Sequence, residues 1–396
     1  MKRQDPMNVA QRSIGHAREA GFSLIELMVG MLVSIICVLG MMAAFAAFEG
    51  PKRTTTSGDD AQQNGSYSLF ELERQIRTAG SGLTQGNKYG VWGCFLSGYA
   101  GGTKLIPWAG TALPPAPFAT WPAGAAKTVA MPVLIASGGT DASGNDASDT
   151  IAVFAGNPAG TVFKSQVQST STASNLVLDN ALGIANGDYL IGATTGGNCV
   201  MGKTSVVTLA TNQMSLSSND SPPTGLISAA YVFDLGQQPV FSLYGVDTST
   251  NSLVTYDLLR RLGNVTQPVA EGIVAIKALY GVDDGAANAA IPGSGTVNDG
   301  VIDEWVRPTG NWSIQTITAT QVSAALAFQQ IKAIRVVVVA RSKLPERATD
   351  YTGSNTLSVF SDIPTLKYTI TTQPQYRYKV YDTTVPIRNA LITRLF

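Results

Sequence analysis

Only a few side chains in this sequence have the type and spacing that chemistry requires. The single histidine, His16, precedes a long apolar run that begins at Phe22. The chain after it therefore has no residues for a Ser-His-Asp triad, a Cys-His pair or a histidine-ligated metal. Because histidine is the commonest general acid and base, this composition argues against an enzyme.

One carboxylate is unusual because of its surroundings. Glu26 is the only charged residue in the apolar run 22–48, which as a helix of roughly 40 Å would cross a bilayer core of about 30 Å. A charge well inside a membrane costs about 2.5–3.5 kcal/mol and usually has a partner. Glu26 is either an interfacial acid near the start of this helix or a group that binds a cation. Cleavage between Gly21 and Phe22 would create such a cation, a free amino group about one helical turn away.

Oxygen-bearing side chains gather in a second place, near residues 283–304. They are Asp283, Asp284, Asn298, Asp299, Asp303 and Glu304. Oxygen ligands interleaved with glycine are what a Ca²⁺ loop requires, so a Ca²⁺ site is one interpretation. Residues 285–297 separate the two acidic groups, and this gap favours the alternative of a solvated acidic loop. We expect no other cofactor, because the glycine-rich 293–300 lacks the G-K-[ST] ending of a phosphate loop.

The three cysteines divide into one inside the apolar run, Cys37, and two after it, Cys94 and Cys199. In an oxidising compartment we expect Cys94 and Cys199 to form a disulfide. Two free thiols are the alternative. Cys37 is most simply a small residue that packs or faces lipid.

Composition limits the class of protein and its partners. Charged residues make up 14% of the chain, below the roughly 25% of typical soluble proteins, and 40 glycines accompany many Ser, Thr, Ala and Asn residues. These values indicate a β-rich exported protein with many loops. The net charge is zero and no segment is dense in Lys or Arg, so we expect no binding to nucleic acid.

The apolar run 22–48 and the charges on either side of it predict a single-pass membrane protein. Basic residues before the apolar run favour a cytoplasmic N-terminus, although Lys52 and Arg53 after the run oppose this orientation. The run is too long for the core of a secretory signal peptide. After a break at 49–60, apolar residues at helical spacing predict an amphipathic helix that ends at Gly80 and Gly82 and packs on a sheet. These apolar residues are Leu69, Leu72, Ile76 and Ala79.

The remainder of the chain is expected to be rich in β-strands. Strands are predicted at 149–156, 175–179, 188–193, 205–211, 229–235, 240–246, 252–259, 273–282, 331–342 and within 375–392. The strand at 331–342 is apolar enough to lie at the centre of a sheet covered on both faces. A short helix is predicted at 319–330. Residues 97–148 are rich in Gly, Ala, Pro and Ser and are predicted to be long surface loops.

The N-terminal residues resemble a known family. The segment "GFSLIELMVGMLV" resembles the prepilin motif of type IV pilins and type II secretion pseudopilins. The resemblance implies that a prepilin peptidase cuts after Gly21 on the cytoplasmic face and that the new N-terminal residue, Phe22, is methylated. It also implies that Glu26 pairs with the N-terminal amine of an adjacent subunit, which would relieve the cost of a carboxylate in apolar surroundings.

Segments further along narrow the resemblance to the PilW-type minor pilins. They are "SDTIAVF", "VAEGIVAIKALYGVD", "RVVVVARS" and "YKVYDTTVPIRN", while 97–148 and 286–297 resemble insertions. The implied fold class is α+β, with a long N-terminal transmembrane and amphipathic helix packed on a large β-rich pilin-like domain. The expected division is a leader at 1–21, a transmembrane helix at 22–48, an amphipathic extension at 49–82 and the globular domain at 83–396.

The resemblance implies a structural subunit that primes assembly of a type IV pilus and lies at its tip. Its partners would be other minor pilins, the major pilin, the prepilin peptidase and the inner-membrane assembly machinery. It would reside in the inner membrane with a periplasmic C-terminal domain, and then in the extracellular pilus. A type II secretion pseudopilin and a pilus-tip adhesin are the alternative functions.

Overall fold

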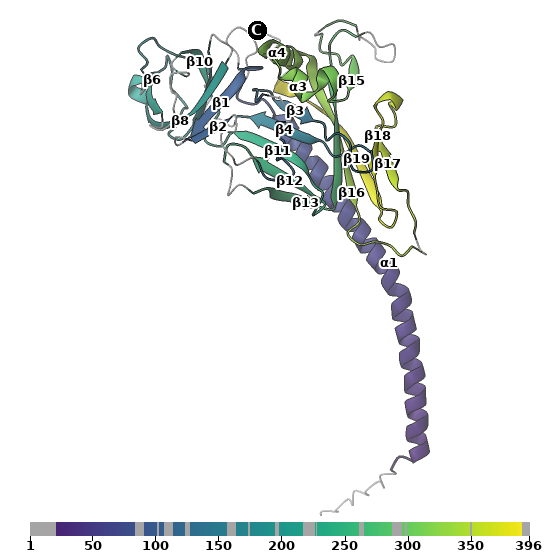
Figure 1. The fold of residues 1–396 in the computed structure, drawn as a ribbon. Helices are drawn as coiled ribbons and strands as arrows, with labels where there is room; N and C mark the ends of the chain where they lie inside the picture. Colours follow the sequence, from purple (N-terminus) through teal and green to yellow (C-terminus); the bar gives the residue numbers. More distant parts are fainter. Residues whose placement is uncertain are drawn as a thin grey trace, which may run out of the picture. The chain divides into compact units, whose positions relative to one another are not determined.

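Figure 1 shows the computed structural model of the chain. The structure describes residues 21–83, 91–100, 103–106, 114–122, 127–156, 164–172, 175–194, 198–216, 226, 228–260, 265–286, 295–297, 299–348 and 351–389. The chain forms two units, Met1–Thr55 and Thr56–Phe396. The predicted leader and His16 lie outside the described residues.

The first long element is α1 (Leu24–Thr78), which begins in one unit and ends in the other. Its continuity contradicts the break that the sequence predicted at 49–60. Pro51 lies within this helix of 55 residues, where it removes one backbone hydrogen bond. The bonds of the turns on either side are enough to keep the chain helical.

In the second unit α1 packs with the predicted apolar face inward. Leu72, Ile76 and Ala79 are fully buried, and Leu69 packs beside them. Gly65 lets the helix approach the sheet closely, because a Cβ atom there would lie 2.2 Å from the ring of Tyr381. The helix ends at Thr78, before Gly80 with a φ of 78°, as the sequence predicted.

Within the described residues the strands form four sheets. The largest has the order β2-β1-β8-β7-β10-β5, with β9 pairing with both β8 and β6. Its strands are β1 (Phe95–Ala100), β2 (Thr103–Ile106), β5 (Lys164–Gln166), β6 (Asn175–Val177), β7 (Tyr189–Thr194), β8 (Asn198–Thr208), β9 (Gln213–Leu216) and β10 (Ala229–Asp234). The 3₁₀ turn η1 (Leu209–Thr211) connects β8 to β9.

A five-stranded and a four-stranded sheet complete the main core. The first has the order β13-β12-β11-β4-β3 and the second β15-β14-β16-β19, all antiparallel. Their strands are β3 (Val133–Ala136), β4 (Thr150–Ala155), β11 (Val240–Asp247), β12 (Ser252–Asp257), β13 (Gln267–Glu271), β14 (Ile273–Val282), β15 (Glu304–Val306), β16 (Ile331–Arg341) and β19 (Tyr378–Pro386). β16 lies between β14 and β19 and is buried along almost its whole length, as its apolar sequence predicted.

Short elements cover the edges of these sheets. The helices α3 (Ile314–Ile317) and α4 (Gln321–Gln330) precede β16, and a Thr320–Ser323 capping box begins α4. The hairpin of β17 (Thr356–Val359) and β18 (Tyr368–Thr371) lies beside β16 and β19 in Figure 1 and closes a small core with them. The 3₁₀ turns η3 (Gly310–Trp312) and η4 (Pro364–Leu366) connect these parts.

The prediction that 97–148 is a surface loop is wrong for much of the segment. It contains β2, β3 and most of β1, and the side chains of Phe118, Trp121 and Met131 are buried in the main core. Gly, Pro and Ser are common between these pieces. An apolar run as short as Val133–Ala136 was therefore not recognised as a strand in the sequence. The predicted strands from 149 onward and the predicted helix at 319–330 all have a counterpart.

Candidate functional site

The start of α1 contains the three residues predicted for cleavage, methylation and docking. Phe22 is 86% exposed, and a Cβ atom added to Gly21 would contact nothing within 4 Å. Both residues precede the helix, which begins at Leu24. The cut expected after Gly21 would therefore fall in exposed backbone outside the helix.

Glu26 has a partner in its own chain. Its Oε2 accepts a hydrogen bond of 3.0 Å from the backbone N–H of Ser23, and the Ser23 carbonyl accepts one of 3.1 Å from Leu27. Ser23 is thus the N-cap of α1, and Glu26, three residues on, supplies one half of a capping box. The pattern S-x-x-E at 23–26 signals this local role, which the sequence interpretation missed.

Within the part of the chain that the structure describes, the apolar half of α1 buries none of its side chains. Leu24–Phe45 has a mean hydropathy of 2.5 over 22 residues, which is long and apolar enough to cross a membrane. All of its side chains are exposed, including that of the free Cys37. An exposed apolar surface of this extent requires a cover of lipid or of other helices.

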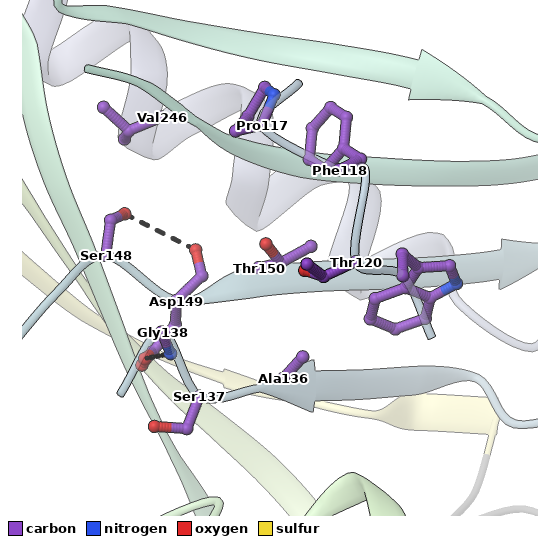
Figure 2. A pocket seen from close by; sticks show the side chains of 11 residues that line it. Pro117, Phe118, Thr120, Ala136, Ser137, Gly138, Ser148, Asp149, Thr150 and Val246 are labelled. Carbon is purple, nitrogen blue, oxygen red and sulfur yellow. Dashed lines mark hydrogen bonds between the residues drawn. The ribbon is translucent and has the colours of Figure 1, made fainter. Parts of the chain in front are cut away.

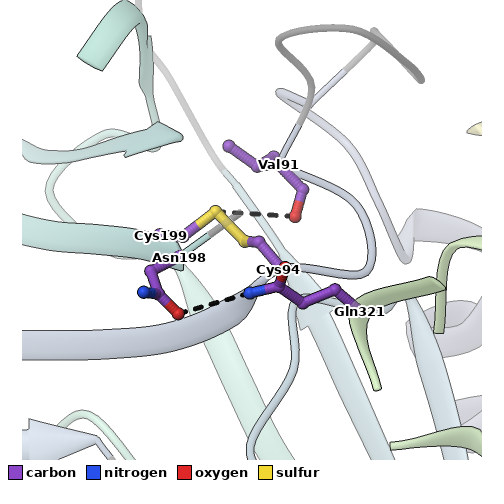
Figure 3. Close-up of a disulfide and its surroundings, with 5 residues drawn as sticks. All are labelled: Val91, Cys94, Asn198, Cys199 and Gln321. Atoms are coloured by element: carbon purple, nitrogen blue, oxygen red, sulfur yellow. Dashed lines mark hydrogen bonds between the residues drawn. A yellow bond between two sulfur atoms is a disulfide. The ribbon is translucent and has the colours of Figure 1, made fainter. Parts of the chain in front are cut away.

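The two cysteines after the apolar run lie together in the fold. A disulfide joins Cys94 to Cys199, with Cα atoms 5.6 Å apart and both residues buried (Figure 3). It connects the start of β1 to β8, its parallel neighbour. Gln321 of α4 donates a hydrogen bond of 3.3 Å to Asn198 beside the disulfide. This part of the domain therefore links two strands and a helix.

The acidic residues near 283–304 act as acceptors for backbone N–H groups. Asp303 is fully buried and accepts from Gly285 at 2.6 Å and from Gly295 at 3.0 Å. Asp283, also fully buried, accepts from Gly300 at 2.7 Å and lies 3.6 Å from the Nζ of Lys332. Both carboxylates thus hold the two ends of the loop together.

The remaining members of this acidic group stabilise local turns. Asp284 accepts from the N–H of Ala286 at 3.1 Å, and Asp299 accepts from Val301 at 2.8 Å. Asn298 lies outside the described residues. No group of three or more acidic, histidine or cysteine side chains among the described residues is arranged to hold a metal. Asp283 and Asp303 are buried rather than solvated, which differs from the predicted solvated acidic loop, and the Ca²⁺ site stays a prediction.

A buried ion pair that the sequence interpretation did not single out lies between two sheets. Lys277 of β14 and Asp149, which precedes β4, are both fully buried, and Nζ lies 2.6 Å from Oδ1. Desolvation raises the pKa of Asp149, while Lys277 and backbone N–H groups oppose that shift. A lone lysine in the otherwise uncharged strand 273–282 was the sequence signal.

Two further carboxylates are buried at the junction of β7 and β10. Asp234 Oδ1 accepts from the N–H of Gly236 at 2.8 Å, and Asp188 Oδ2 accepts from Ala185 at 2.6 Å. Burial, with the like charge of Asp188 as a smaller cause, raises the pKa of Asp234 to about 6. Neither carboxylate was predicted to be buried from the sequence.

Comparisons with known proteins agree with the resemblance seen in the sequence. Residues 243–389 match the PilW family, described as "Type IV Pilus-assembly protein W", and residues 16–42 match the "Prokaryotic N-terminal methylation motif". The second match includes Gly21, Phe22 and Glu26, and the first runs from β11 to the end of β19. The segment "SDTIAVF" at 148–154, which also contributed to the resemblance, lies outside both.

A solved structure of a pilin aligns with part of this chain. A "Type IV-like pilin TTHA1219 from Thermus thermophilus" aligns with 52% of this chain and 86% of its own, at 10% sequence identity and a TM-score of 0.21. Similarity this low supports no argument about function. No curated protein matches the chain.

Proposed function

We propose that this chain, which matches the PilW family of type IV pilus-assembly proteins over residues 243–389 and the prepilin methylation motif over residues 16–42, primes filament assembly and remains at the filament tip. The observation that carries the proposal is the contrast along α1. The second unit buries the end of the helix in its own core, whereas Leu24–Phe45 is exposed over its whole length. Such a helix is complete only when lipid, and later the helices of other subunits, surround it.

The proposal includes a definite order of processing. The chain inserts with its basic N-terminus in the cytoplasm and the domain after residue 49 in the periplasm. A prepilin peptidase cuts after Gly21, and Phe22 is methylated. The exposed position of these residues outside the helix supports that order. The mature chain then enters a complex with other minor pilins, from which the major pilin polymerises.

Glu26 has two roles in this scheme. Before assembly its carboxylate caps α1 through the Ser23 N–H. During assembly it pairs with the N-terminal amine of a neighbouring subunit, which compensates its charge in apolar surroundings. The two roles differ in what they require, because a cap needs an acceptor oxygen and the docking interaction needs a negative charge.

Two substitutions separate these roles. Glu26→Gln keeps an acceptor for the Ser23 N–H but removes the charge, whereas Glu26→Ala removes both. We expect both variants to insert in the membrane at wild-type levels and to be absent from purified pili, as measured by immunoblot of membrane and pilus fractions. Wild-type incorporation of the Glu26→Gln variant would contradict docking by charge and leave only the cap.

Deletion of the chain tests the priming role. A primer is required to start filaments, so we expect the deletion strain to lose surface pili, counted by electron microscopy, and to regain them when the chain is restored. Normal pili with lost attachment would instead indicate a tip adhesin. The role we propose is structural throughout, since the family that the chain matches is described as one of pilus assembly.

A further inference from the structure

The pair of Lys277 and Asp149 is the most completely buried charged pair among the described residues. Lys277 lies in the middle of β14 and Asp149 directly before β4, so the pair connects two different sheets across 128 positions of sequence. Both side chains are 0% exposed. The ammonium Nζ also donates to the Ala147 carbonyl at 2.8 Å and lies 4.2 Å from the centre of the Tyr368 ring.

The carboxyl group is fixed by backbone donors on both of its oxygens. The N–H of Gly138 donates to Oδ1 at 3.1 Å, and the N–H of Ala278 donates to Oδ2 at 3.0 Å. Because a C–O bond is about 1.2 Å long, the carbon Cγ lies within about 3.8 Å of the Lys277 nitrogen. A nucleophile and an electrophilic carbon are therefore held near contact, and both side chains are buried.

From this geometry we propose that Lys277 and Asp149 condense to an intramolecular amide bond. Lys277 transfers a proton to the carboxylate, and the resulting amine attacks Cγ. The new N–Cγ bond forms as one Cγ–O bond breaks, and that oxygen leaves as water with two protons that came from the ammonium. An ammonium and a carboxylate thus become one amide and one water, and no oxidant or reductant takes part.

The surroundings favour this product. Two buried charges carry a desolvation cost that a neutral amide does not. Burial also raises the pKa of Asp149, which favours the protonated acid that attack requires. The N–H groups of Gly138 and Ala278 are placed to stabilise negative charge on the carboxyl oxygens as the tetrahedral intermediate forms. One reaction in the life of each molecule is sufficient, so a slow rate does not prevent it.

A cavity beside Asp149 can accept the water that is released. It has a volume of about 200 Å³ and is bordered by the hydroxyl-bearing residues Thr120, Ser137, Ser148 and Thr150 (Figure 2). A polar cavity of this size holds water readily. Asp149 lies on its wall, between Ser148 and Thr150.

A second pair provides an internal comparison. Lys332 and Asp283 are also buried, but Nζ lies 3.6 Å from Oδ2, and Lys332 additionally donates to the Gln329 carbonyl. We expect no condensation there. The inference does not rest on the proposed function, because it requires only that the domain folds.

Peptide mass spectrometry of the full chain, extracted from membranes and digested with trypsin, tests the proposal. Cleavage at Lys and Arg yields 128–164, which contains Asp149, and separates 262–277 from 278–332. If Lys277 is acylated, trypsin cannot cut after it, and 128–164 appears joined to 262–332 with the loss of one water. We also expect cutting after Lys332 to remain complete.

Separate, unmodified peptides 128–164 and 262–277 from folded wild-type protein would overturn the proposal. Lys277→Arg is the matched variant, since a guanidinium keeps the charge but does not condense, and trypsin should then cut at position 277. If that variant fails to fold, the wild-type digest alone still decides the question. Asp149→Asn is unsuitable as a negative control, because an amide side chain could form the same bond with loss of ammonia.

Discussion

The two units of this chain differ in whether their apolar side chains are exposed or buried. In the described part of the first unit, residues 21–45 are all exposed and mostly apolar. In the second, three hydrophobic clusters bury apolar side chains between sheets and around the end of α1. The second unit has the interior of a self-sufficient domain, whereas the first has an apolar surface that only lipid or other helices can cover.

Substitutions in the two units should therefore change different properties, namely the stability of the domain and assembly into filaments. Changes inside the second unit should alter the free energy of unfolding and reach assembly only through folding. Changes at Glu26 should alter assembly and leave the unfolding of the domain unchanged. The following predictions test that separation, beginning with the largest expected effect.

The disulfide should make the largest single contribution. Replacing both Cys94 and Cys199 by Ser removes a link across 105 positions, which costs about 4–5 kcal/mol in the chain-entropy model. Thermal unfolding of the full chain in detergent should show a clear fall in Tm. Cys37→Ser is the matched control, because Cys37 is free and exposed. An equal Tm in the double variant and the wild type would mean that the cysteines do not pair in the cell.

The buried pair should come next. Lys277→Met leaves Asp149 buried with neither the ion pair nor the proposed amide, and removing one partner of a buried pair costs about 3–5 kcal/mol before any further loss from the missing crosslink. Chemical denaturation should report this loss. The double variant Lys277→Met and Asp149→Leu should recover part of it, because no buried charge remains. If Lys277→Met alone unfolds like the wild type, the pair is not structural.

Asp234 should give a smaller effect that depends on pH. Its folded pKa of about 6 lies above the unfolded value, so between these values the folded state holds a proton that the unfolded state lacks. The contribution of this group to stability is therefore greatest below the unfolded pKa and declines as pH rises to about 6. Asp234→Asn should stabilise the domain above pH 7 by up to about 3 kcal/mol and have no effect near pH 4.

The pH series itself supplies the check on Asp234. Denaturation midpoints of the variant and the wild type should converge as the pH falls. Asp247→Asn is a suitable comparison, since hydrogen bonds from Ser249 lower the pKa of that partly exposed carboxylate. A gain for Asp234→Asn that is constant across pH would show that burial does not perturb this carboxylate.

Calcium should have the smallest effect. The carboxylates of Asp283 and Asp303 already accept backbone hydrogen bonds, and we expect neither Ca²⁺ nor a chelator to move the Tm. Calorimetry on the purified chain should likewise show no binding heat. A saturable signal would restore the Ca²⁺ interpretation of the acidic loop.

Much of the fold followed from local patterns in the sequence. Runs such as 273–282 and 331–341 are long and apolar, so they are expected to be buried on both faces. Both form inner strands of a sheet. The apolar spacing of Leu72, Ile76 and Ala79 likewise predicted the buried face of α1. What these segments share is that their own residues determine both the element and its burial.

Other features depend on residues that are distant in sequence. β3 has only four residues and is buried because β4 pairs with it and the main core lies against it, which its Gly- and Pro-rich surroundings do not show. The Lys277–Asp149 pair forms only when β4 and β14 meet. At Glu26 the sequence showed an unusual carboxylate and two explanations for it, an interfacial position or a cation partner, and the structure adds the Ser23 cap.

We propose that this chain is cut, methylated and built into a filament through its exposed helix. Mass spectrometry of purified pili tests it most directly, by identifying the N-terminal peptide of this chain. We expect the filaments to contain a peptide that begins at methylated Phe22. We also expect this peptide to be present in a much smaller amount than the major subunit. Recovery of the chain only from membranes, still joined to residues 1–21, would contradict it.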